Sequence, residues 1–162
     1  MERLNLEVSE TLKVRIKKLH KNAIIPKYAK PGDAGLDLTA VSKYFDEYGN
    51  LCYGTGLAFE IPKGYVGLIF PRSSICKNQL LLSNSVGVID SGYRGEVSFK
   101  FKPSNSFASV LYDTDWEQNG AYKVGDRIGQ MIIMPYPQIE FVEVDELSET
   151  ERGTGGYGSS GR

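Results

Sequence analysis

The chain has few of the residues that form metal centres and disulfides. Its 162 residues include two cysteines, Cys52 and Cys76, and one histidine, His20. The cysteines lack the paired spacing of a zinc site and the histidine is distant from both in sequence, which argues against a zinc centre. Cys76 lies in an apolar sequence context, so we expect it to pack in the interior rather than to act as a nucleophile. A chain of this length can fold as one domain without a disulfide or a metal.

Long apolar runs and an excess of positive charge are also missing. No segment approaches the roughly 18 consecutive apolar residues of a membrane span, and residues 1–8 contain no apolar core of signal-peptide length. The 19 Lys and Arg are balanced by 20 Asp and Glu, so there is no general basic field for a long nucleic acid. We therefore expect a soluble, cytoplasmic protein with no membrane or nucleic-acid partner. A small anionic ligand remains open, because a few local cations suffice to bind one.

The chain does have many short runs of apolar and β-branched residues, separated by turn-forming pairs such as Pro31-Gly32 and Asn119-Gly120. This pattern is typical of an all-β sandwich or barrel. We expect one short helix after Ser73-Ser74, with these serines as its caps. The runs that we expect to form strands are 14–19, 36–41, 56–61, 65–70, 80–82, 97–101, 107–112, 128–134 and 139–144.

The stretch from Gly87 to Val97, GVIDSGYRGEV, is the most informative part of the sequence. It places a carboxylate (Asp90), an aromatic ring (Tyr93) and a cation (Arg94) between two strand-like runs. Ser91-Gly92 predicts a turn, which puts Asp90 at the mouth of a hairpin. The backbone of such a hairpin can bind the flat edge of a base as it binds another strand. From these residues alone a solvated Asp in an ordinary hairpin is the favoured interpretation, because short motifs often arise by chance.

Three further segments carry polar side chains between apolar runs. Pro71 to Ser74 (PRSS) offers a guanidinium and two hydroxyls, which suit an anion site or an ordinary capped turn. Asp33 and Asp37 lie among glycines and could serve a hydrated cation or a turn. Gln130 is a polar residue in an apolar strand, where a buried amide needs a partner and a ligand phosphate is one.

The last eleven residues, RGTGGYGSSGR, are rich in glycine and serine and cannot form a core of their own. We therefore divide the chain into one β domain, residues 1–151, and a flexible arm, residues 152–162. Tyr157 and the flanking arginines indicate more than a frayed end. Glycine N–H groups and arginine bind phosphate, and an aromatic ring can close over a base.

In this order, the segments AGLDL, PRSS, GVIDSGYRGEV, RIGQM and RGTGGYGSSG resemble the five motifs of the trimeric dUTP pyrophosphatase (dUTPase) family. The resemblance extends from about Val14 to the C-terminus. It implies a jelly-roll-like β-barrel with one short helix. It also implies a homotrimer with shared active sites, dependence on Mg²⁺, and hydrolysis of dUTP to dUMP and pyrophosphate, which keeps uracil out of DNA and supplies dUMP for dTMP synthesis.

The resemblance also implies roles for single residues. Asp90 corresponds to the carboxylate that orients and activates the attacking water. Tyr93 corresponds to the ring beneath the deoxyribose, where it leaves no room for a 2′-OH, and Tyr157 to an aromatic lid over uracil. The residues similar to the family's uracil contacts are Asn84, Gly87, Val88 and Ile89.

Phosphate contacts and the metal site follow from the same resemblance. The metal is expected to be held indirectly, through substrate phosphates and water, with Asp37 as a supporting acid. The residues similar to the family's phosphate contacts are Arg72, Ser73, Ser74 and Gln130, and in the arm Arg152, Gly158, Ser159 and Ser160.

The chain departs from the family pattern at three places. Tyr157 replaces a phenylalanine and Gly129 replaces an alanine, and both changes are conservative in role. The excursion from Pro103 to Lys123 is longer than in a compact member and could alter trimer contacts or recruit a partner. A dCTP deaminase of the same fold would need a glutamate about where Lys100 lies, which disfavours that activity. A regulatory module that only binds nucleotide is the alternative from another class, and the intact Asp90 argues against it.

Overall fold

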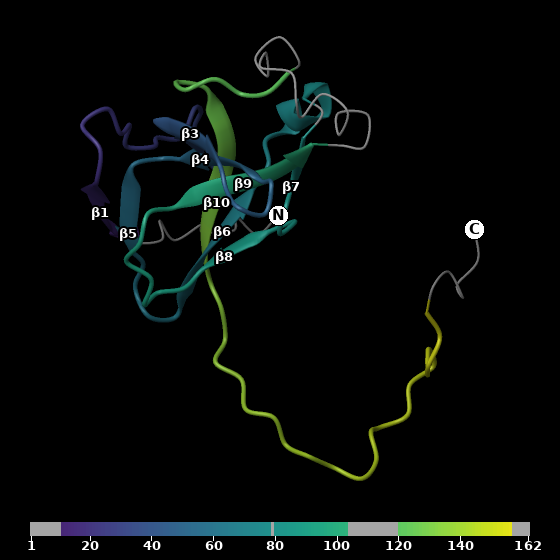
Figure 1. Ribbon diagram of the computed structural model, residues 1–162. Coiled ribbons are helices and arrows are strands. Elements are labelled where there is room, and N and C mark those ends of the chain that lie inside the picture. Colours follow the sequence, from purple (N-terminus) through teal and green to yellow (C-terminus); the bar gives the residue numbers. More distant parts are fainter. Residues whose placement is uncertain (1–10, 79, 104–119, 157–162) are drawn as a thin grey trace, which may run out of the picture.

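The described part of the protein is an antiparallel β structure with one short 3₁₀ helix (Figure 1). The computed structural model describes residues 11–78, 80–103 and 120–156. They form a pair of strands and two four-stranded sheets. The pair contains β1 (Arg15–Lys18) and β5 (Leu57–Glu60); one sheet has the order β2 (Leu36–Thr39), β10 (Arg127–Pro135), β6 (Tyr65–Phe70), β8 (Gly87–Ile89); the other has the order β3 (Ser42–Phe45), β4 (Leu51–Gly54), β9 (Ser98–Pro103), β7 (Leu80–Leu82).

The core lies between the two four-stranded sheets, because both contribute to one cluster of buried side chains. In β9, Phe99 and Phe101 are fully buried whereas Lys100 and Lys102 are exposed. This alternation follows from the two-residue period of a strand. The ring of Phe101 meets that of Tyr53 edge to face, with centroids 5.9 Å apart. The prediction of an all-β fold is therefore confirmed.

Gly129 leaves the space that this aromatic core needs. A Cβ atom at position 129 would lie 2.0 Å from Cε1 of Phe99, far inside van der Waals contact. The alanine that the family resemblance places there would collide with a fully buried ring. Glycine at this position is a packing requirement of this chain.

Two details of the sequence prediction were wrong, and a third is not tested. β7 and β9 pair with each other, but the chain between them enters the other sheet as β8 and pairs with β6, so no simple hairpin joins them. Residues 139–144 form no strand. The expected strand 107–112 and the Asn119-Gly120 turn lie wholly or partly outside the described residues.

The segment after β6 also differs from expectation. It forms a five-residue 3₁₀ helix, η1 (Ser73–Lys77), which begins after Arg72 without a side-chain capping bond, so the serines are not caps. Cys76 is exposed on η1 and Cys52 is the buried thiol, which reverses the expectation for Cys76. Within the part of the chain that the structure describes, no helix is long and apolar enough to span a membrane.

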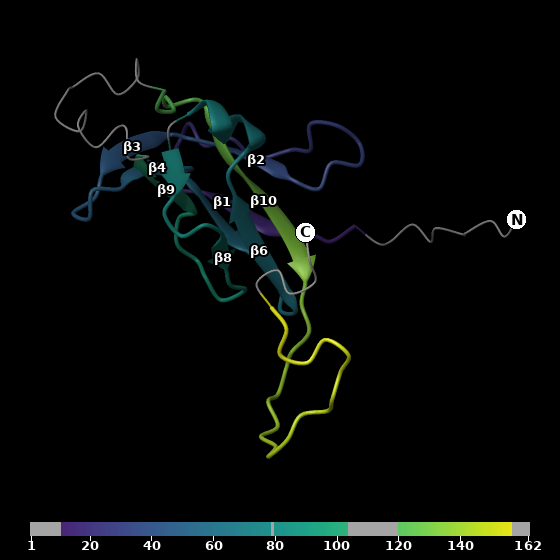
Figure 2. The same ribbon diagram turned by 90° about the vertical axis from the view of Figure 1, so that its right-hand side faces the viewer.

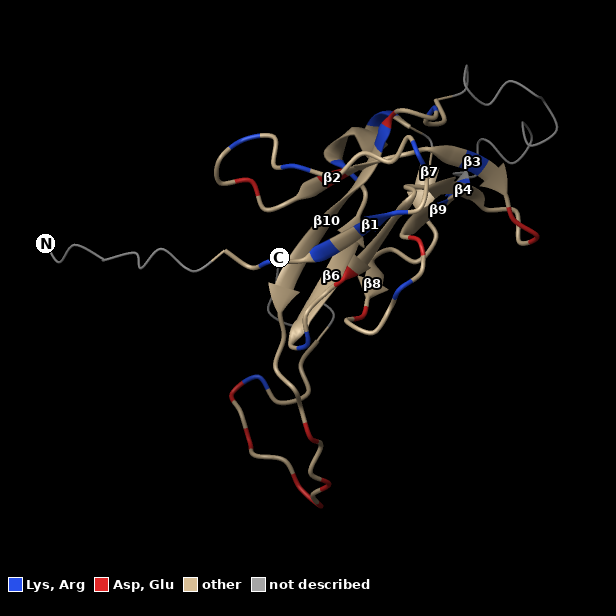
Figure 3. Ribbon diagram, turned by 90° about the vertical axis from the view of Figure 1, so that its left-hand side faces the viewer, with Lys and Arg blue, Asp and Glu red and all other residues tan. Residues whose placement is uncertain are grey.

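The chain leaves the sheets after β10. Residues 136–156 run away from the strands in both views (Figure 1, Figure 2). Their apolar side chains are exposed, with Phe141 at 90% and Val142 at 78% of full accessibility. Acidic residues alternate with them, whereas β1 carries basic residues (Figure 3).

Candidate active site

The segment from Gly87 to Val97 borders a cleft at the edge of a sheet. β8 pairs with β6 on one side only, so among the described residues its other edge has no strand partner. The cleft has a volume of about 160 Å³. Six residues that the sequence analysis selected for the base, the sugar and catalysis line it together: Asn84, Gly87, Val88, Ile89, Asp90 and Tyr93.

Asp90 and Tyr93 lie in one tight turn. The Tyr93 N–H donates to the Asp90 carbonyl at 3.0 Å, and the Tyr93 hydroxyl donates to the Glu96 carbonyl, also at 3.0 Å. Both side chains are exposed. In the described part of the chain no hydrogen bond reaches the Asp90 carboxylate. This carboxylate is therefore open to water and to a ligand.

A second cluster forms around Asp37 on β2. Arg72 Nε donates to Asp37 Oδ1 at 2.8 Å, and Arg127 Nη1 donates to Oδ2 at 2.9 Å. Arg72 also reaches Ser74 Oγ at 3.4 Å, while Ser73 is exposed on η1. Segments distant in sequence meet here because β10 pairs with both β2 and β6. The carboxylate fixes two guanidinium groups, and each keeps further donors for an anion.

Gln130 lies at the centre of this sheet, opposite Asp37 on β2 and Phe70 on β6. Its Nε2 donates to the Pro71 carbonyl at 3.0 Å. The amide therefore already has a protein partner, which the sequence alone did not reveal. It holds the chain that leads into Arg72.

The two clusters belong to separate clefts of one chain. Arg72, Ser74 and Arg127 line a cleft of about 330 Å³, and no residue of it also lines the cleft of Asp90. Arg152 lies in the segment that leaves the sheets and donates to the Gly155 carbonyl, at 3.0 Å, so it lines neither cleft. The other selected residues of the arm lie outside the described residues: Tyr157, Gly158, Ser159 and Ser160.

The acidic residues do not form a protein cage for a metal. No three His, Cys, Asp or Glu side chains of the described residues are grouped to hold an ion. Asp33 accepts the Lys30 N–H at 2.9 Å, which is the turn that the sequence left as one alternative. Both oxygens of Asp37 accept from arginines.

Sequence reasoning did not select Arg127 and Glu96, which both contact the selected segments. Glu96 lines the cleft of Asp90, and its Oε1 accepts the Gly56 N–H at 2.6 Å. Both residues lie inside the motifs that the sequence analysis quoted. Their only further signal was a charge beside an apolar strand, which equally fits a solvated side chain.

Lys100 occupies the position where a dCTP deaminase would need a glutamate. Its Nζ donates to Asp46 Oδ2 at 3.0 Å. Burial raises the pKa of Asp46, but hydrogen bonds from Asn50, Lys100 and the Tyr48 N–H outweigh it and hold this pKa well below its ordinary value. The same bond raises the pKa of Lys100. Burial raises the pKa of the Cys52 thiol, and nearby Asp46 adds to the effect. Lys100 is therefore a paired cation.

Comparison with known families identifies the fold. The dUTPase family model matches residues 21–161, nearly the whole of the chain. The chain belongs to the dUTPase family. This confirms the resemblance and, with it, the jelly-roll-like β fold that the dUTPase structures share.

Relatives in the dUTPase family cover almost all of the chain. The deoxyuridine 5′-triphosphate nucleotidohydrolase of Nautilia profundicola is 40% identical over 153 residues, which are 93% of this chain and 100% of the relative. That of Rhodococcus erythropolis is 39% identical over 156 residues, 95% of this chain and 89% of the relative. The dUTPase of Staphylococcus bacteriophage 80alpha, solved with dUpNHpp, has a TM-score of 0.77 and 30% identity; 94% of this chain and 100% of the phage chain are covered. The dUTPase of phage phi11 of S. aureus, with a TM-score of 0.68, 27% identity and coverage of 83% and 98%, is described with a structural Mg(II) ion.

Proposed function

We propose that the protein hydrolyses dUTP to dUMP and pyrophosphate by attack of water at the α-phosphate. The observation that carries this proposal is the cleft at the edge of β8, where the exposed Asp90 carboxylate lies beside Tyr93. The names of the bacterial relatives, deoxyuridine 5′-triphosphate nucleotidohydrolases, support it. The reaction keeps uracil out of DNA and supplies dUMP for the synthesis of dTMP.

The free edge of β8 suits a pyrimidine base. Backbone N–H and C=O groups of Gly87 to Ile89, together with the Asn84 amide, offer donors and acceptors to the edge of uracil. A base with another pattern would leave buried polar groups unpaired, which discriminates strongly. Tyr93 lies beneath the deoxyribose, and its ring excludes a 2′-OH.

Asp90 acts as the general base. It orients a water molecule and accepts one of its protons while the water oxygen bonds to the α-phosphorus. The bond from this phosphorus to the bridging oxygen breaks, and pyrophosphate leaves. General-base assistance of this kind accelerates a reaction by about 10²- to 10⁴-fold.

The Asp37 cluster and the arm bind the phosphates. Cationic and hydroxyl donors neutralise charge on the leaving pyrophosphate. A bound Mg²⁺ would be held indirectly, through substrate phosphates and water with Asp37 as a supporting acid, and would neutralise further charge on the phosphates. The phosphate contacts are Arg72, Ser73, Ser74 and Gln130, and from the arm Arg152, Gly158, Ser159 and Ser160, with Tyr157 closing over uracil.

The working enzyme is a homotrimer with shared active sites. One chain holds Asp90 and Arg72 in two clefts without common lining residues, yet one triphosphate needs both. A neighbouring chain can supply the missing half. The apolar side chains of residues 139–144, after β10, are exposed in the single chain. Exposed apolar patches often mark interaction surfaces, and we propose that a second copy of the chain buries these side chains.

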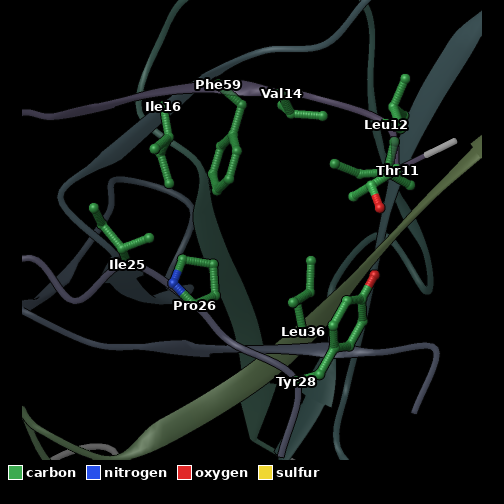
Figure 4. A pocket seen from close by; sticks show the side chains of 10 residues that line it. Thr11, Leu12, Val14, Ile16, Ile25, Pro26, Tyr28, Leu36 and Phe59 are labelled. Atoms are coloured by element: carbon green, nitrogen blue, oxygen red, sulfur yellow. The ribbon is translucent and has the colours of Figure 1, made fainter. Parts of the chain in front are cut away.

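The surface of the second copy that we propose for this contact is an apolar groove beside β1 (Figure 4). The groove has a volume of about 320 Å³, and Val14, Ile16 and Phe59 point into it. β1 pairs with β5 only, so among the described strands its other edge can accept an added strand. Residues 139–144 of another copy fit this place, because their apolar side chains match the groove and their acids match the exposed Lys17 and Lys18 of β1.

Mixing two inactive variants tests the shared site. Asp90→Asn and Arg72→Gln chains are each expected to lose most turnover, and trimers refolded from an equal mixture should recover part of it. Recovery occurs because some sites combine Asp90 from one chain with Arg72 from another. A solution mass of three chains should accompany it. A mixture as inactive as its components, or a monomeric mass, would show that each chain builds its own site.

Release of pyrophosphate from dUTP and Mg²⁺ by the purified protein tests the activity. We expect equal amounts of dUMP and pyrophosphate, and an Asp90→Asn variant that binds dUTP but turns over at least about 100-fold more slowly. Binding of dUTP by the wild type without pyrophosphate would instead support a regulatory module. That alternative has a precedent, because phage dUTPases are described as controlling the transfer of virulence genes.

A further inference from the structure

Arg94 follows Tyr93 in the sequence but does not face the cleft of Asp90. It lines another cleft, of about 370 Å³, together with Ser91 and Glu60, and this cleft shares no lining residue with that of Asp90. The roles proposed above therefore leave Arg94 without a function. A half-exposed cation next to the nucleotide cleft needs its own explanation.

The guanidinium of Arg94 donates two hydrogen bonds to the turn that carries Asp90 and Tyr93. Its Nη1 donates to the Ser91 carbonyl at 2.7 Å and to the Tyr93 carbonyl at 2.9 Å. These carbonyls lie on either side of Gly92, so one charged group bridges the whole turn. Hydrogen bonds from a charged donor are roughly twice as strong as neutral ones.

The other side of the guanidinium faces a carboxylate. Arg94 Nη2 lies 3.7 Å from Glu60 Oε1 on β5. Arg15 on β1 pairs with the same oxygen. The hydrogen-bond and ion-pair partners that the structure gives Arg94 are two backbone carbonyls and the Glu60 carboxylate, although Lys13, Arg15 and Lys63 line the same cleft.

We propose that Arg94 is a positioning residue for the proposed reaction. It holds the Ser91–Tyr93 turn so that the Asp90 carboxylate and the Tyr93 ring keep their relative places, and Glu60 orients it from behind. This role rests on the proposed hydrolysis of dUTP, in which Asp90 activates water and Tyr93 excludes ribose. A displacement of about 1 Å at such a site can lower a rate by about 100-fold.

Arg94→Ala, with Arg15→Ala as the matched control, tests this role. Both changes remove an exposed arginine that contacts Glu60, but only the first releases the turn. For Arg94→Ala we expect kcat for dUTP to fall by about 10- to 100-fold and the preference for dUTP over UTP to fall by about tenfold. Arg94→Lys, which can reach one carbonyl, should retain part of both. The melting temperatures of the two alanine variants should agree.

Hydrogen exchange gives a readout that does not depend on activity. Because the Tyr93 N–H bonds to the Asp90 carbonyl, Arg94→Ala should speed exchange of this amide by about tenfold, and Arg15→Ala should not. Wild-type kcat, selectivity and exchange in Arg94→Ala would overturn the proposal, as would equal losses in Arg15→Ala. A third outcome separates the two proposals. If the wild type does not hydrolyse dUTP but Arg94→Ala still exchanges the Tyr93 amide faster than Arg15→Ala does, the proposed function is overturned and the role of Arg94 in holding the turn is retained.

Discussion

Replacing Asp37 by asparagine removes the charge that two arginines share, and the structure predicts that the two pairs differ in strength. The side chains of Asp37 and Arg72 are 22% and 25% exposed, so water screens their pair only in part. The side chain of Arg127 is 55% exposed. A partly buried hydrogen bond between charged groups stabilises a fold by about 1.5–3 kcal/mol. An exposed pair contributes only about 0.2–1 kcal/mol.

Two double-mutant cycles measure these contributions. One combines Asp37→Asn with Arg72→Gln and the other combines it with Arg127→Gln, and the free energy of unfolding is measured in urea. All variants are compared at one protein concentration, because association of chains changes apparent stability. We expect the coupling energy with Arg72 to exceed that with Arg127 by about 1 kcal/mol or more, which corresponds to about 2–4 °C in melting temperature.

Equal coupling energies, or a larger one with Arg127, would refute the reasoning. Such a result would mean that exposure does not control the strength of these pairs. Coupling below about 0.3 kcal/mol for both would show that the Asp37 cluster does not stabilise the free chain. Arg72 and Arg127 would then take up their positions only when substrate binds, and not in the free chain.

Two further predictions concern packing and acid stability. Gly129→Ala should lower the free energy of unfolding by about 1–3 kcal/mol, because the new methyl overlaps the Phe99 ring. Adding Phe99→Leu to this variant should restore part of the loss in the same urea titration. A loss that the second change does not reduce would argue against the overlap. Because the pKa of Asp46 is lowered in the folded protein, its stabilisation is full above the unfolded value of about 3.9 and is lost as the pH falls below it. Asp46→Asn should therefore show a smaller drop in melting temperature between pH 6 and pH 3 than the wild type shows. The control Glu47→Gln, which changes an exposed neighbour, should behave as the wild type. An equal drop in Asp46→Asn and the wild type would contradict the lowered pKa of Asp46.

Periodicity predicted the strands that place apolar residues on one face, but it missed the hairpin of β3 and β4. The turn between them depends on the Asp46 carboxylate, which accepts the Asn50 N–H at 2.8 Å and the Tyr48 N–H at 3.1 Å. A contact between a side chain and a nearby backbone leaves no periodic signal. Residues 139–144 show the opposite error. They have strand-like composition, but a strand needs a partner edge, and within the described residues they pair with none.

For the site, the residue types could be predicted from the sequence, but which of them meet could not. Asp37, Arg72 and Gln130 come together only because β10 lies between β2 and β6, and this pairing joins segments far apart in the chain. The contact of Arg127 with Asp37 follows from the same pairing. No local pattern contains such information, so the resemblance to a family was needed to group the motifs.

Asp37 and Asp90 illustrate what local sequence leaves undecided. Each is an aspartate in a short polar motif beside apolar residues, and either could be the base. The structure surrounds Asp37 with two guanidinium groups that occupy both oxygens, whereas no hydrogen bond reaches the Asp90 carboxylate within the described residues. Both oxygens of Asp37 are thus already occupied by donors of its own chain, whereas the Asp90 carboxylate can accept from a water molecule. In the trimer that we propose, the Asp90 cleft of one chain and the Asp37 cluster of a neighbour bind one substrate, so the general base and the phosphate-binding cations come from different chains.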